Sequence, residues 1–289
     1  MSILEDKLKQ SMQGDDSFLY HYTSLSSACK IFENRSLKLS NLTNTNDPLE
    51  FLSTEAGGIT VRGDADIRKI FYELTISRKK RENFVRMICF CKDQFCNNEE
   101  WKNEKAQDFA ANLLHKGWAR SRMWAQYADN HNGVCLVFDK KLFKKQFDSL
   151  ANADIKILQD RPITYTNYLT ELETAMSDLT ETTGISDDYS NFYLDEKRTQ
   201  YLFQKCQDYR DENEYRFCLI NQKLQSPDEA MFLKYGSSLI AVILGQRFSY
   251  TLKLQIPNKI EQYRIYWNYG RPNLIKIAQS LQRIRNCRA

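Results

Sequence analysis

Three short apolar runs, one of them interrupted by Arg86, constrain the fold of this chain more than any other feature of its sequence. They are VRMICFC at 85–91, VCLVF at 134–138 and LIAVILG at 239–245. Each run has the length of a strand, and β-branched and aromatic residues, which favour strands, are frequent in them. The sequence therefore predicts three buried strands.

The rest of the chain mixes strand and helix signals. Ala28, Ile31 and Phe32 have the spacing of one helix face and follow serine residues that can cap a helix, which predicts a helix over 26–36. KKLFKK at 140–145 begins a basic helix. Strand character is found in further segments, namely 17–24, 37–42, 155–167, 211–220, LKLQIP at 252–257 and YRIYW at 263–267.

These signals favour a single α+β domain over residues 1–289, with antiparallel or mixed strands. Residues 1–16 read as a polar lead-in that contains one helix. We expect a helical insertion at about 168–208 and a basic C-terminal helix at about 272–289. No internal repeat is found.

Composition and missing motifs exclude several classes of protein. Hydrophobic residues make up 42% and charged residues 27%, which argues against collagen-like, coiled-coil and disordered chains. No run of 18 apolar residues predicts a membrane span, and MSILEDKLKQSMQGDD has no apolar signal-peptide core. We therefore expect a cytoplasmic protein with no membrane partner. Walker A, GxGxxG, HExxH and GxSxG motifs are missing, which disfavours P-loop NTPases, Rossmann enzymes and zincins.

Eight cysteines raise the question of a metal site. Cys89, Cys91 and Cys96 cluster in CFCKDQFC, but the CxxC spacing of zinc sites does not occur. Disulfides are rare in the cytosol, and free cysteine is often buried. We expect buried structural thiols here and no metal.

Two polar groups near the N-terminus are candidates for a site. His21 and Thr23 share one face of a predicted strand, and the flanking tyrosines make either a packed histidine or a functional one possible. Ser40 precedes a loop that contains Asn46 and Asp47. The side chains of this loop either form hydrogen bonds to their own main chain, as in turns, or line a polar site together with Ser40.

Two further groups lie in the second half of the chain. Trp124 and Tyr127 share a helix face, as core aromatics often do, and His131 lies beside the tight turn Asn132-Gly133. On a strand, Glu212, Glu214 and Arg216 would point to one face. Charged side chains in such a row usually face solvent and pair with one another. If they face a cleft instead, their pKa values are shifted and they can act as an acid/base site.

The order of these pieces resembles a large bacterial family of uncharacterised proteins. The resemblance is carried by YHYTS, NDPLE, ICFC, MWAQYADNHNGVCLVFD and DENEYRF, and it covers about residues 18–245. The middle motif is the most specific of these.

A strand with His21, then a helix, a strand with Ser40 and a late strand with Glu214 is similar to the ADP-ribosyltransferase fold. That resemblance implies split antiparallel or mixed β-sheets with NAD in the cleft between them. Glu212 and Glu214 would match the Glu-x-Glu element of that fold. Members with a first-strand His commonly have Tyr where this chain has Ser40, so another aromatic residue must stack on nicotinamide.

The resemblance implies roles for individual residues. Catalysis is expected from Glu214, His21 and Ser40, and acceptor contacts from Glu212, Arg216, Asn46 and Asp47. NAD would be held by residues from three segments, namely His21, Tyr22, Thr23, Ser40, Trp124, Tyr127 and His131. One carboxylate at ~4 Å from the cation that develops on the ribose contributes about 4 kcal/mol at an effective dielectric constant of 20, or roughly a thousandfold in rate.

The implied function is that of an NAD-dependent ADP-ribosyltransferase acting as a toxin or phage-defence effector, with a neutralising antitoxin as partner. The acceptor would be RNA, DNA or protein. Net charge is only +4, but KKLFKK and the basic residues Lys276, Arg283, Arg285 and Arg288 favour nucleic acid, RNA first.

Two alternatives remain open. One is a non-catalytic binding or sensor module on the same fold. The other is a metal-dependent hydrolase or nuclease that uses Asp47, Glu50, Asp129 and His131.

Overall fold

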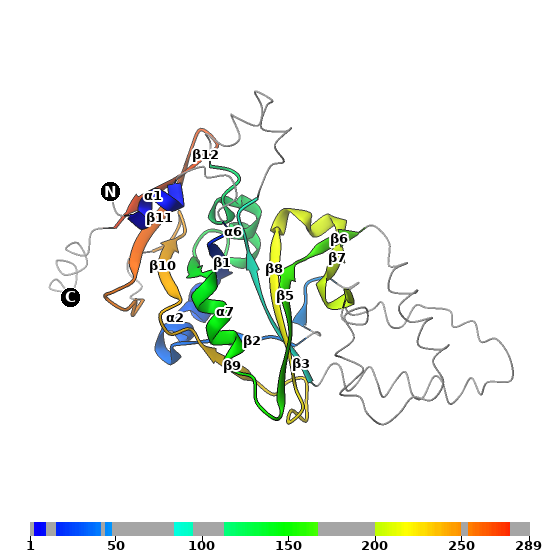
Figure 1. Cartoon of the computed structure of the whole chain (residues 1–289). Coiled ribbons are helices and arrows are strands. Elements are labelled where there is room, and N and C mark those ends of the chain that lie inside the picture. Colours follow the sequence, from blue (N-terminus) through cyan, green and yellow to red (C-terminus); the bar gives the residue numbers. More distant parts are fainter. Residues whose placement is uncertain are drawn as a thin grey trace, which may run out of the picture.

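An eight-stranded sheet forms the centre of the molecule (Figure 1). The computed structural model describes residues 3–9, 16–41, 44–47, 84–94, 113–166, 200–249 and 254–277. From edge to edge the sheet consists of β12 (Arg271–Lys276), β11 (Glu261–Asn268), β10 (Leu239–Leu244), β4 (Val134–Asp139), β1 (Phe18–Thr23), β3 (Val85–Cys91), β8 (Glu214–Asn221) and β5 (Ile155–Pro162). Neighbours are antiparallel except β10 and β11, which are parallel.

Two strand pairs and a few helices accompany this sheet. The pairs are β2 (Ser36–Leu39) with β9 (Met231–Lys234), and β6 (Thr164–Thr166) with β7 (Gln204–Cys206). The α-helices are α1 (Ile3–Lys9), α2 (Leu25–Asn34), α6 (Ser121–Tyr127) and α7 (Lys140–Asp148). The 3-10 helices are η3 (Gly117–Ala119), η4 (Gln200–Phe203) and η5 (Gln207–Glu212). The expected α+β content with antiparallel or mixed strands is thus confirmed, and most of the strands belong to one large mixed sheet.

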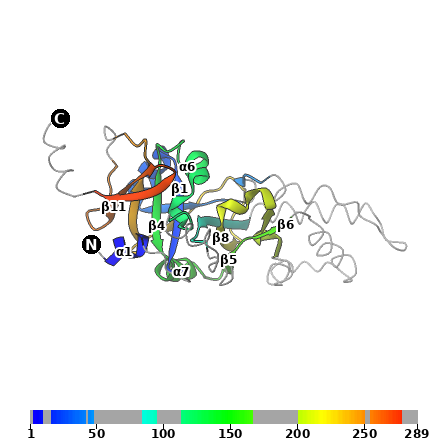
Figure 2. The ribbon, with the colours of Figure 1, turned by 90° about the horizontal axis from the view of Figure 1, so that it is seen from above.

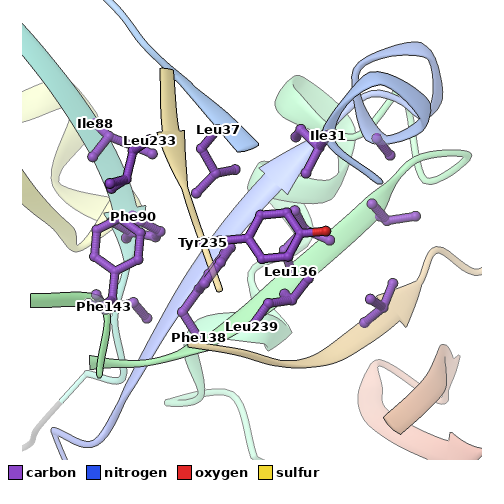
Figure 3. Packing of buried hydrophobic residues seen from close by; sticks show 14 of the residues in the cluster. Ile31, Leu37, Ile88, Phe90, Leu136, Phe138, Phe143, Leu233, Tyr235 and Leu239 are labelled. Atoms are coloured by element: carbon purple, nitrogen blue, oxygen red, sulfur yellow. The ribbon is translucent and has the colours of Figure 1, made fainter. Parts of the chain in front are cut away.

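Apolar residues on one face of the sheet form an aromatic core. Phe90 packs edge-on against Phe138, Phe143 and Phe217, with ring centroids 4.8–5.9 Å apart. Helices α2 and α7 and the β2–β9 pair contribute the buried residues that cover it. Figure 3 shows side chains of β2 and β9 facing those of β3. We call this side the aromatic face.

The opposite face is built from the alternate residues of the same strands, because successive side chains of a strand point to opposite sides. Tyr20 and Tyr22 lie there with Trp118 and Trp124, both of which are 0% exposed. Figure 2 shows α6, which carries Trp124, and α7 on opposite sides of β1 and β4. We call this side the tryptophan face.

The sheet is weakly joined between β1 and β3. These strands pair at one position, Tyr20 with Cys91. Farther along, Met87 of β3 instead exchanges two main-chain hydrogen bonds of 2.8 Å with Ser40, just beyond β2. Strand β3 therefore changes its partner along its length.

Most of the predicted elements lie where the sequence indicates, but three segments differ. The expected C-terminal helix is wrong over 272–276, which lie in strand β12. Pro272 and Leu274 alternate inward there, with the period of a strand. Residues 278–289 are outside the described part of the chain.

The other two differences concern the insertion and a short strand. Where a helix was expected at 200–206, the chain forms η4 and β7, because Leu202 and Phe203 are buried in the core and 204–206 pair with β6. Residues 167–199 are not described. The predicted strand at 252–257 is not observed over 254–257. Among the described residues, no helix is long and apolar enough to cross a membrane.

Candidate functional site

Four charged side chains meet inside the protein at the start of β8. The ammonium of Lys205 donates to Glu212 Oε2 at 2.7 Å and to Glu214 Oε2 at 3.2 Å. Arg216 Nε donates to Glu214 Oε1 at 2.8 Å. All four residues are at most 6% exposed. We call Lys205, Glu212, Glu214 and Arg216 the carboxylate cluster, and its four charges neutralise one another.

A left-handed residue brings the two glutamates together. Glu212 ends η5 instead of lying on the strand with Glu214, as the sequence had predicted. Between them, Asn213 has φ 44°, a conformation that asparagine tolerates better than most residues. Its side chain donates to the carbonyls of Lys92 and Asp93 at 2.9 and 3.0 Å. This turn is therefore tied to the end of β3.

A chain of hydrogen bonds links the carboxylate cluster to the surface. Tyr127 of α6 donates its hydroxyl to Glu212 Oε1 at 2.6 Å. The exposed Asn46 donates to the same hydroxyl at 2.9 Å, and Tyr209 donates to the Asn46 carbonyl at 2.9 Å. Among the two glutamates, Glu212 is thus the one that hydrogen bonds connect to exposed groups.

Other polar residues hold this arrangement in place. Asp47 is 1% exposed and accepts the Cys206 main-chain N–H at 2.7 Å, next to Lys205. The Tyr165 hydroxyl accepts the Glu214 N–H at 2.8 Å. The Lys205 ammonium also lies 4.7 Å from the centre of the Tyr209 ring.

Electrostatics separates the roles that the two glutamates can take. Burial acts to raise the pKa of Glu214, but the cations of Arg216 and Lys205 outweigh it and hold that pKa at about 2. Glu214 is therefore a fixed negative charge. Burial and the neighbouring Glu212 raise the pKa of Tyr127, so its hydroxyl keeps its proton and remains a donor.

The cluster and its surroundings gather six of the residues expected at a site, namely Asn46, Asp47, Tyr127, Glu212, Glu214 and Arg216. His21 is not among them. It pairs with Leu136 on the aromatic face, whereas Glu214 pairs with Cys91 on the tryptophan face. His21 Nδ1 lies 3.1 Å from the Cys89 carbonyl, its ring packs edge-on against Phe90, and burial lowers its pKa.

The remaining candidate residues pack and form hydrogen bonds inside the protein instead of lining a site. Ser40 lies in the bridge to β3 described above, and Thr23 is 7% exposed. Tyr22 donates its hydroxyl to the Gly117 carbonyl at 2.6 Å and packs edge-on against Trp124. Trp124 has no exposed face and donates Nε1 to the Trp118 carbonyl at 2.8 Å. Neither aromatic ring is exposed to stack on a ligand.

The motif around His131 forms a packing junction. Asp129, Asn130 and His131 all have positive φ, at 46°, 50° and 71°. Asp129 Oδ2 accepts the Leu25 N–H at 2.8 Å, at the start of α2, and the His131 ring stacks on Trp124. The turn thereby joins α6 and β4 to α2.

The residues proposed for a metal-dependent hydrolase are not gathered. Asp47 accepts a hydrogen bond from β7, whereas Asp129 accepts one from α2, and Glu50 lies outside the described residues. Within the described ranges, no group of three or more His, Cys, Asp or Glu side chains could hold a metal ion. The cysteines among them are free thiols.

The cluster also contains residues that the sequence analysis missed. Lys205 is the centre of the arrangement, but it stood in a segment predicted to be helical. Tyr165 and Tyr209 were likewise not singled out. No short motif marks them, because an irregular turn and a change of strand separate them from the glutamates.

Part of this chain matches a family of known proteins. Residues 123–217 match the family model "Protein of unknown function (DUF2971)". The matched segment contains Tyr127, Lys205, Glu212, Glu214 and Arg216, whereas Asn46 and Asp47 lie outside it. No curated protein and no solved structure matches the chain. The expected resemblance to an uncharacterised family is thus supported for this segment, and the match names no activity.

Proposed function

We propose that this chain is an NAD-dependent ADP-ribosyltransferase whose reacting groups meet at the carboxylate cluster. The observation that carries the proposal is the pairing of a fixed negative charge, Glu214, with a second carboxylate, Glu212, that is linked to the surface. Enzymes that cleave glycosidic bonds also use two carboxyl groups with different surroundings, one of which stays ionised while the other transfers a proton.

NAD, as substrate, supplies a glycosidic bond between ribose and nicotinamide. When that bond breaks, its electron pair leaves with nicotinamide, and positive charge develops on the ribose. Glu214 stabilises this charge, because a buried carboxylate acts in surroundings of low dielectric constant. The acceptor atom then bonds the ribose carbon and loses its proton, which Glu212 takes.

In this proposal Tyr127 and Asn46 position Glu212, and His21 and Ser40 have no catalytic role. The excess of cations supports nucleic acid, RNA first, as acceptor, with protein as the other candidate. A protein with this activity would act as a toxin or phage-defence effector and would require a neutralising partner.

The test uses NAD labelled in its adenylate phosphate, incubated with wild-type protein and with separate RNA, DNA and protein fractions. We expect label in one fraction, and Glu212→Gln to reduce it by about 100-fold or more. Asp211→Asn is the matched control, since Asp211 is adjacent and exposed; we expect at most a twofold change. Equal labelling by wild type and Glu212→Gln, with both folded by circular dichroism, would contradict the proposal.

One observation favours a binding module as the second candidate. The four charges of the carboxylate cluster satisfy one another fully, as in a structural ion-pair network. A protein that consumes no NAD with any of the three fractions, but whose ligand binding changes in Glu212→Gln, would establish this alternative.

A further inference from the structure

One cation beside the carboxylate cluster has N–H groups without an acceptor among the described residues. The Nε and Nη2 atoms of Arg120 are buried and donate to no acceptor in that part of the chain. Arg86 and Arg216, by contrast, donate to carbonyls or a carboxylate. Burying N–H groups of a cation without an acceptor is unfavourable, so a partner from outside the chain would relieve this cost.

Cys91 connects Arg120 with the region of the carboxylate cluster. It immediately precedes α6, whose Tyr127 bonds Glu212, and its main-chain N–H donates to the Tyr22 hydroxyl at 3.3 Å. Burial raises the pKa of the Cys91 thiol to about 12. The charge of the Arg120 guanidinium and its side-chain hydrogen bond to this thiol act in the opposite direction, and Asp93 and Glu212 add to the rise in this pKa. Cys91 pairs with Glu214 on the tryptophan face.

Among the described residues, Arg120 takes part in no ion pair, whereas the neighbouring cations do. Lys205 and Arg216 balance the two glutamates of the cluster. The neighbouring Lys116 is paired with Asp93 at 3.0 Å. An anionic ligand would give the Arg120 guanidinium the charged partner that no described residue supplies.

The geometry of the guanidinium selects the kind of anion. Nε and Nη2 form one edge of the planar group, and two N–H groups on one edge can bind two oxygens of a phosphate or carboxylate at once. We infer that Arg120 binds a phosphate group of a nucleotide ligand. This inference rests on the proposed function in taking the nucleotide to be NAD, whose pyrophosphate lies next to the ribose that Glu214 serves.

A binding role and a structural role of Arg120 predict opposite effects on stability. Arg120→Gln removes a partly buried guanidinium whose buried Nε and Nη2 atoms have no acceptor among the described residues, so the protein without ligand should unfold at the wild-type temperature or higher. Residues that bind ligands at the expense of stability behave in this way. Arg216→Gln breaks a buried ion pair and should unfold at a lower temperature.

The experiment measures binding of ADP-ribose and of inorganic pyrophosphate by calorimetry to wild type, Arg120→Gln and Arg122→Gln. Arg122 is two residues away and exposed, and it provides the matched control. We expect Arg120→Gln to weaken both ligands at least tenfold and Arg122→Gln to change affinity less than twofold. Wild-type affinity in Arg120→Gln would overturn the inference, and so would a loss of affinity accompanied by a lower unfolding temperature.

The two proposals can fail separately. If both ligands bind through Arg120 but no label is transferred from NAD, the transferase proposal fails and the phosphate site stands. If transfer requires Glu212 while Arg120→Gln keeps the wild-type KM for NAD, the phosphate site fails and the transferase stands.

Discussion

Glu214 makes the stability of the protein depend on acidity in a defined range. Its pKa is about 2 in the folded protein and about 4.3 in an unfolded chain. The stabilisation it contributes is therefore complete above about pH 4.3 and is lost as the pH falls towards 2; in full it amounts to about 3 kcal/mol. At pH 7 Glu214→Gln is expected to lower the free energy of unfolding, because the buried Arg216 loses its carboxylate partner and the buried Lys205 loses one of its two.

The difference between wild type and Glu214→Gln should then shrink by about 2 kcal/mol between pH 7 and pH 3, because at pH 3 the Glu214 carboxyl is protonated in the unfolded chain but still ionised in the folded protein. Urea denaturation at the two pH values measures this. A difference that stays constant would mean that Glu214 is not held ionised by Arg216 and Lys205.

Tyr127 allows a second test among single residues. Tyr127→Phe leaves the buried Glu212 Oε1 without its donor, which should lower the free energy of unfolding by about 1–3 kcal/mol. Tyr269 is 99% exposed, so Tyr269→Phe should change it by less than about 0.5 kcal/mol. Urea denaturation compares the two variants, and equal effects would show that the Tyr127 hydroxyl contributes nothing to the cluster.

The residues of the site could be predicted from sequence only where local spacing was informative. Glu214 and Arg216 alternate on a strand, so their shared face was readable. Lys205 and Arg120 were not, because their partners come from other elements. His21 was misleading for the opposite reason: strand alternation gave its face relative to Tyr20 and Tyr22, but which side of the sheet carries the charges is decided by pairing between β3 and β8.

Among the elements, the turn between α6 and β4 depends most on a glycine. A Cβ atom at Gly133 would lie 2.3 Å from the Thr23 carbonyl oxygen and 2.9 Å from main-chain atoms of Ala128. Main-chain atoms cannot move aside cheaply, so Gly133→Ala should lower the free energy of unfolding by more than about 2 kcal/mol.

Gly270→Ala provides the comparison for Gly133→Ala. Gly270 has φ +77° in the β11–β12 turn, and among the described residues beyond its chain neighbours no heavy atom lies within 4 Å of the position that a Cβ atom would take. Only backbone strain applies there, which costs about 1 kcal/mol. Thermal or urea unfolding of both variants measures the contrast, and a smaller effect at Gly133 than at Gly270 would refute the close approach as the reason for glycine in this motif.

The strands were most predictable where both faces of the strand are buried. The three apolar runs became β3, β4 and β10, which lie inside the sheet and are covered on both faces. Strand β12 is an edge strand and is buried on one side only, so its pattern was short and was mistaken for a helix. Pairing partners, and the change of partner along β3, depend on contacts between distant segments that periodicity does not report.

At the scale of the whole molecule, one sheet separates the core of the aromatic face from that of the tryptophan face, and a third, smaller cluster lies around Leu202 and Phe203. The aromatic face packs under α2 and α7, and the tryptophan face packs under α6 and the carboxylate cluster. Strands β1 and β4 contribute side chains to both cores. Because these strands cannot leave one core and stay in the other, we expect the two faces to unfold together.

Phe143→Leu tests this coupling. It alters the aromatic face alone, where Phe143 is 0% exposed, and should lower the free energy of unfolding by about 1 kcal/mol. In a Trp101→Phe background, fluorescence reports the tryptophan face through Trp118, Trp124 and Trp267. We expect the urea midpoints from fluorescence and from far-ultraviolet circular dichroism to fall by the same amount and to coincide, as they do in a two-state transition. A fluorescence midpoint that stays at its original value while the circular dichroism midpoint falls would show two cores that unfold independently, and the carboxylate cluster would then belong to a unit that keeps its structure without the aromatic face.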